Sequence, residues 1–122
     1  MATVVLIEDD AVLRKAVRKY LSAEGHDVRE ATDGTEARRL LENEPAELVI
    51  TDLYMPGMDG IEFIIRLPEQ SSKPKIIVIS GGGFRDKADL LATAAQLGAD
   101  RTLEKPFSRE QLLEAVAEVL SS

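Results

Sequence analysis

Residues 4–10 read VVLIEDD and residues 48–52 read LVITD, and in both stretches an unbroken apolar run ends in acidic side chains. Short apolar runs rich in β-branched residues are typical of strands that are buried on both faces, as in a parallel sheet. A third run, IIVI at 76–79, has the same character and ends in a serine and three glycines. In open α/β folds ligands bind beyond the carboxyl ends of the strands. These stretches therefore predict both a fold class and the place of a site within it.

Helical patterns separate these strands along the chain. Two weaker strand patterns complete a set of five, at 28–31 and 101–104. Apolar residues at helical spacing predict five helices, around residues 13–21, 37–41, 61–65, 90–97 and 112–120. Ser108 and Gln111 form the pattern of a capping box at the start of the last helix. Strict alternation of strand and helix, with short right-handed connections, predicts a doubly wound α/β sandwich that occupies residues 1–122 as a single domain.

The composition excludes several classes of protein. The 122 residues include 22 Asp plus Glu and 15 Lys plus Arg, for a formal net charge of −7, and no Cys. Without Cys there is no disulfide scaffold, thiol nucleophile or thiolate metal site. No apolar run approaches the roughly 20 residues of a membrane span, and the first residues lack the pattern of a signal peptide, so we expect a cytoplasmic protein. The negative charge argues against direct binding of nucleic acid or an anionic membrane. His26, the one histidine, is expected at the surface without a role.

Four of the strand ends carry residues that are suited to binding a metal ion and a phosphoryl group. They supply Glu8-Asp9-Asp10, Asp52, Ser80-Gly81 and Lys105. Crowded carboxylates repel one another unless a cation compensates, and hard oxygen ligands with room for water favour Mg²⁺. Taken singly, each residue has a commoner role: Asp10 as a helix N-cap, Ser80 as a turn residue and Lys105 as a surface charge. Their coincidence at one edge of a sheet is what predicts the site.

With these residues in place, the chain resembles the receiver (response-regulator) domains of two-component signalling, of the stand-alone, CheY-like kind. The resemblance extends from about residue 4 to residue 120. It rests on six segments: VVLIEDD, ATDGTEA at 31–37, TDLYMPGMDG at 51–60, IIVISGG at 76–82, LGAD at 97–100 and EKPF at 104–107. It implies a flavodoxin-like sheet of five parallel strands in the order 2-1-3-4-5, together with five helices.

The resemblance also implies a metal site. Glu8 and Asp9 match the acidic pair of the family, and Arg14 follows Asp9 at a spacing where many members carry Arg. Asp52 and the main-chain carbonyl of Tyr54 would complete the protein ligands of Mg²⁺.

For phosphoryl transfer, the resemblance implies that Asp52 is the phosphoacceptor. It would be phosphorylated by a sensor histidine kinase or a histidine phosphotransfer protein. Lys105 and Ser80 would contact the phosphoryl group, Gly81 would leave room beside it, and the Lys105-Pro106 peptide would be cis. Such a chain is a signalling phosphoacceptor rather than an enzyme with a substrate of its own. Its phosphorylated state would bind a downstream protein effector differently or relay the phosphoryl group.

Two positions depart from the usual receiver pattern, and two other functions stay open. Thr102 stands where many receivers carry Tyr or Phe, and Tyr54 stands where a smaller or polar residue is common. We expect Tyr54 to alter the access of water and therefore the lifetime of the phosphorylated state. One alternative is an Mg²⁺-dependent phosphatase with an aspartyl nucleophile, although Tyr54 then replaces the expected second acid. The other is a binding module that keeps the fold but not the phosphate chemistry, against which the full set of implied site residues is present.

Overall fold

The computed structural model describes residues 2–52, 73–81, 92 and 95–122. Its strands are β1 (Thr3–Ile7), β2 (Asp27–Ala31), β3 (Leu48–Asp52), β4 (Lys75–Ser80) and β5 (Arg101–Glu104), and its helices are α1 (Ala11–Ala23), α2 (Gly34–Asn43) and α5 (Arg109–Leu120). Residues 95–97 are helical as well, whereas the helix expected around 61–65 lies outside the described residues. No described helix is long and apolar enough to cross a membrane.

The strands form one sheet in the order β2-β1-β3-β4-β5, and every neighbouring pair is parallel. Both the predicted α/β fold and the strand order are thus confirmed. Ile7 lies opposite Thr51, Asp52 opposite Ile79, and Ser80 opposite Glu104. This register brings the carboxyl ends of β1, β3, β4 and β5 to one edge of the sheet, where Glu8, Asp9 and Asp52 lie.

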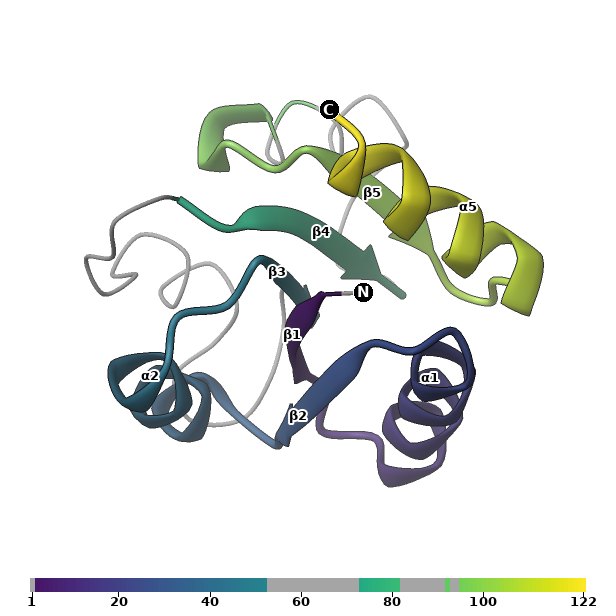
Figure 1. Cartoon of the computed structure of the whole chain (residues 1–122). Coiled ribbons are helices and arrows are strands. Elements are labelled where there is room, and N and C mark those ends of the chain that lie inside the picture. Colours follow the sequence, from purple (N-terminus) through teal and green to yellow (C-terminus); the bar gives the residue numbers. More distant parts are fainter. Residues whose placement is uncertain (1, 53–72, 82–91, 93–94) are drawn as a thin grey trace.

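Helices cover both faces of the sheet, and side chains alternate between two cores. Val4 and Leu6 join one core with residues of α1 and α5, whereas Val5 and Ile7 join the other with residues of α2. Figure 1 shows the same division, with α1 and α5 on one side of the sheet and α2 on the other. Because each central strand is buried on both faces, its sequence is a continuous apolar run rather than an alternating one.

Side-chain caps determine where the helices begin. Asp10 accepts hydrogen bonds from the main-chain N–H groups of Val12 and Leu13, at 2.9 and 3.3 Å, and so begins α1 directly after the acidic pair. Ser108 and Gln111 form the predicted capping box of α5. Such caps satisfy N–H groups that have no partner within the helix.

His26 is half-buried in the turn between α1 and β2, which corrects the expectation of a surface residue without a partner. Its Nδ1 accepts a hydrogen bond from the main-chain N–H of Ala2 at 3.1 Å, so it ties this turn to the start of the chain. Burial lowers the pKa of His26, because desolvation disfavours the charged imidazolium.

Stability should therefore fall on mild acidification in a way that depends on His26. The pKa of His26 in the folded protein lies below its unfolded value of about 6.5, so the unfolded chain binds the proton more readily and stability is lost as the pH falls through that value. We expect the free energy of unfolding of the wild type to drop more between pH values of about 7.5 and 5.5 than that of His26→Gln, as measured by urea denaturation. Parallel pH profiles for the two proteins would contradict this assignment.

Candidate functional site

Three carboxylates meet at the carboxyl edge of the sheet. Glu8 directly follows β1, Asp9 follows it in the loop, and Asp52 ends β3. Each offers an oxygen, and these oxygens all lie within 4.8 Å of one another. Glu8 and Asp52 are buried and Asp9 is exposed, so the cluster is accessible from solvent on the side of Asp9. The structure thus brings together the three acidic side chains that were predicted to share a metal site.

Lys105 supplies the positive charge inside this cluster. Its Nζ donates a hydrogen bond to Asp52 Oδ2 at 2.7 Å and lies 2.9 Å from Glu8 Oε1. Its main-chain N–H donates to the carbonyl of Ser80 at 2.8 Å, which anchors the loop after β5 to the end of β4. The Lys105-Pro106 peptide is cis, as the resemblance implied.

The cluster contains more negative charge than Lys105 can neutralise, because three carboxylates face one ammonium. Burial raises the pKa of Glu8, and the nearby Asp9 raises it further, against the lowering effect of the Asp10 N–H group and Lys105. Burial would lower the pKa of Lys105, but its contacts with Asp52 and Glu8 outweigh that effect and raise it overall. Lys105 therefore stays charged, and a second cation would relieve the remaining repulsion.

One oxygen of Glu8 is a candidate ligand for such a cation. Oε2 accepts the main-chain N–H of Asp10 at 3.0 Å, whereas Oε1 is buried and accepts no hydrogen bond from a main-chain N–H or hydroxyl group of the residues that the structure describes. Lys105 Nζ, 2.9 Å away, forms an ion pair with Oε1 and is shared with Asp52. A buried carboxylate oxygen is costly unless it is paired or coordinates a metal. The all-oxygen donor set suits Mg²⁺, which usually keeps several waters beside one or two carboxylates.

Ser80 and Gly81 lie at the adjacent end of β4. Ser80 is buried, and Gly81 directly follows the strand. A Cβ atom at Gly81 would lie 3.0 Å from Cδ of Lys105, so a side chain there would press on the lysine stem. The glycine thus leaves room for Lys105, in addition to the room for phosphate that the resemblance implied. Tyr54, whose carbonyl was expected to bind the metal, lies outside the described residues.

Arg14, whose spacing from Asp9 matched the family, also contacts this site, a role that the sequence did not predict. Nη1 of Arg14, on the first turn of α1, donates to the main-chain carbonyl of Glu8 at 2.8 Å. A contact to a main-chain atom leaves no pattern of residue types, so the spacing of Arg14 from Asp9 was the only available signal.

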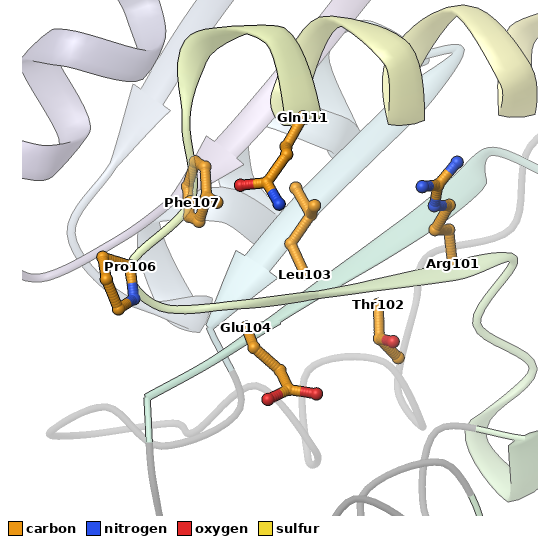
Figure 2. A pocket seen from close by; sticks show the side chains of 7 residues that line it. All are labelled: Arg101, Thr102, Leu103, Glu104, Pro106, Phe107 and Gln111. Atoms are coloured by element: carbon orange, nitrogen blue, oxygen red, sulfur yellow. The ribbon is translucent and has the colours of Figure 1, made fainter.

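A separate cavity of about 330 Å³ borders β5 and the start of α5. Its lining contains none of the three carboxylates and consists of Arg101, Thr102, Leu103, Glu104, Pro106, Phe107 and Gln111. Figure 2 shows that Thr102 and Glu104 point to one side of β5, while Arg101 and Leu103 point toward α5. The position that carries an aromatic ring in many receivers is thus a half-buried threonine beside this cavity.

Comparisons with known proteins agree with this geometry. The sequence pattern of the response regulator receiver domain matches residues 4–117. The response regulator MprA of Mycobacterium sp. (strain KMS) is 34% identical over 110 residues, which cover 90% of this chain and 46% of that protein. The chain therefore spans just under half the length of the curated relatives that it matches.

Solved structures show the same similarity. The chemotaxis protein CheY4 of Vibrio cholerae superposes with a TM-score of 0.87 at 29% identity, covering 98% of each chain. A CheY-like receiver domain protein of Methanospirillum hungatei JF-1 superposes with a TM-score of 0.86 at 25% identity, covering 99% of this chain and 94% of the other. Since the family pattern extends across the five strands and the acidic edge between them, the chain belongs to the response regulator receiver domain family of two-component signalling.

Proposed function

We propose that Asp52 is the phosphoacceptor of this receiver domain and that its phosphoryl donor is a phosphohistidine on a sensor histidine kinase or a histidine phosphotransfer protein. The observation that carries the proposal is the contact of 2.7 Å between Asp52 Oδ2 and Lys105 Nζ, in a pocket that is accessible beside Asp9. This contact presents a carboxylate oxygen at the strand end together with a cation that can contact an incoming phosphoryl group.

In the transfer step, a carboxylate oxygen of Asp52 attacks the phosphorus atom. The phosphorus–nitrogen bond to the donor imidazole breaks, and the imidazole leaves and takes a proton from water. The product is an acyl phosphate on Asp52. A carboxylate is a weak nucleophile, so the protein contributes mainly by positioning the groups and by neutralising charge. Lys105 offsets the negative charge of the phosphoryl oxygens, and the hydroxyl of Ser80 is a further hydrogen-bond donor at the neighbouring strand end.

Glu8, Asp9 and Asp52 would hold Mg²⁺ in this pocket, and the resemblance assigns the main-chain carbonyl of Tyr54 as the remaining protein ligand. The buried Oε1 of Glu8, whose ion-pair partner Lys105 is shared with Asp52, supports the assignment of the carboxylates, together with the excess of negative charge. When bound, Mg²⁺ reduces the repulsion between the carboxylates and the phosphoryl oxygens. The chain's own residues hold the ligand oxygens in place and exclude water from the side of Glu8.

The phosphoryl group is the signal in this proposal. Phosphorylation of Asp52 adds negative charge next to Ser80, which ends β4, and next to Lys105. Lys105 lies between β5 and α5, so the added charge acts on the connection between these two elements. The modified domain then binds a downstream protein effector with altered affinity or passes the phosphoryl group on. We place the protein in the cytoplasm, where it contacts neither nucleic acid nor membrane directly.

Incubation with acetyl phosphate and Mg²⁺ should add one phosphoryl group to the intact protein, as measured by mass spectrometry. Asp52→Asn should abolish the gain, because an amide oxygen is a much poorer nucleophile. Asp10→Asn is the matched control: it removes a neighbouring carboxylate but preserves the helix cap, since Asn caps as well as Asp. It should be phosphorylated like the wild type.

Two results would contradict the phosphoacceptor assignment. The absence of any mass gain in the wild type would favour a module that keeps the fold without the phosphate chemistry. Sustained hydrolysis of many phosphomonoesters would favour a phosphatase.

Mg²⁺ should stabilise the wild type against unfolding, because it binds the folded carboxylate cluster and not the unfolded chain. At ten times the dissociation constant the gain should be about 1.4 kcal/mol, measured by chemical denaturation with and without Mg²⁺. Asp9→Asn should lose most of this gain and Asp10→Asn should keep it. Equal gains in both variants would show that the ion acts on the overall negative charge rather than at this site.

A further inference from the structure

Arg14 connects the first turn of α1 to two strands. Its side chain is only 14% exposed, and its guanidinium makes two contacts. Nη1 donates to the main-chain carbonyl of Glu8 at 2.8 Å, and Nε lies 3.3 Å from Oε1 of Glu30 on β2. The other oxygen of Glu30 accepts a hydrogen bond from Arg18 at 2.6 Å. Glu30 therefore orients the guanidinium of Arg14, and Arg14 in turn holds the main chain at the end of β1.

These contacts fix the backbone on both sides of Asp9. The N–H group of Glu8 donates to the carbonyl of Ala31 at 3.1 Å, and its carbonyl accepts from Arg14. On the other side, the N–H group of Asp10 donates to Glu8 Oε2, and the Asp10 side chain caps α1. Asp9 itself is exposed, so the position of its carboxylate depends on this backbone rather than on surrounding packing.

We propose that Arg14 is a positioning residue for the metal site: it fixes the peptide between Glu8 and Asp9 and thereby keeps the Asp9 carboxylate near the oxygens of Glu8 and Asp52. This inference rests on the proposed Mg²⁺ site. If the peptide rotated, the Asp9 carboxylate would leave the cluster, although the buried Glu8 and Asp52 would stay in place. Hydrogen bonds from a charged donor are among the stronger ones, which suits Arg14 to this task.

A merely structural role for Arg14 makes a different prediction. If Arg14 only attached α1 to the sheet, its loss would lower the free energy of unfolding but leave the affinity for Mg²⁺ unchanged. The dissociation constant of Mg²⁺ therefore distinguishes the two roles without relying on phosphorylation. It can be measured by isothermal titration calorimetry or by the amide shifts of residues 8–10 in NMR spectra.

We expect Arg14→Gln to bind Mg²⁺ about 10-fold more weakly than the wild type, within the range seen when a group that orients a metal ligand is removed. The affinity of Arg14→Lys for Mg²⁺ should lie between those of the wild type and Arg14→Gln. An ammonium can donate to the Glu8 carbonyl, but it lacks the planar guanidinium that contacts Glu8 and Glu30 at the same time. The Mg²⁺ concentration for half-maximal phosphorylation by acetyl phosphate should rise in parallel. The maximal rate at saturating Mg²⁺ should change by less than about twofold, since the reacting groups are intact.

Arg18→Gln is the matched control, because Arg18 is 55% exposed and contacts the same Glu30 without touching Glu8. It should bind Mg²⁺ like the wild type. Glu30→Gln provides a second test should Arg14→Gln fail to fold: it keeps the bond to Glu8 but weakens the orientation of Arg14, and it should raise the dissociation constant.

The inference is overturned if the wild type binds Mg²⁺ and the folded Arg14 and Glu30 variants bind it equally well. A wild type that does not bind Mg²⁺ at all would instead overturn the proposed metal site, and the role of Arg14 with it.

Discussion

The ammonium of Lys105 between the carboxylates of Glu8 and Asp52 is the contact on which the site depends. It joins the end of β1, the end of β3 and the loop after β5, three segments that are far apart in the sequence. Two buried carboxylates side by side would be strongly unfavourable without this cation. The lysine compensates only part of the charge, and the remaining negative charge is what makes the pocket receptive to a further cation.

The parallel sheet makes this arrangement possible. In a parallel sheet with right-handed crossovers all strands end at the same edge, so residues that follow different strands meet without any extended loop. The register of β1 with β3 and of β3 with β4 then determines which of these residues are neighbours. Packing on both faces holds the strands in place, while the polar groups of the site lie at the last residues of the strands or directly after them. The charged site therefore lies at the end of an apolar scaffold that holds its residues in place.

The backbone of the loop after β1 is as constrained as its side chains. Its polar main-chain groups are engaged by Ala31, Arg14 and the side chain of Glu8, while Asp10 caps the helix that follows. A carboxylate on the surface, such as that of Asp9, would otherwise sample many positions and lose conformational entropy on binding an ion. Pre-organised ligands reduce that cost. The first turn of α1 thus helps to hold the main chain around Asp9 as well as to form the fold.

The strands, the order of elements and the cap of α5 could be read from the sequence, because they depend on local patterns of apolar and capping residues. The acidic residues, Ser80 and Lys105 could be placed at one edge for the same reason, since each directly follows a predicted strand. Three further features depended on the tertiary structure: the ion pair of Lys105 with the buried oxygen of Glu8, the closeness of Gly81 to the stem of Lys105, and the bond from Arg14 to a main-chain carbonyl. The hydrogen bond of His26 belongs with them, because its partner is the main-chain N–H group of Ala2, just before β1. Local patterns report which residue types follow one another, whereas these contacts depend on the distances and angles between atoms that only the packed chain brings together.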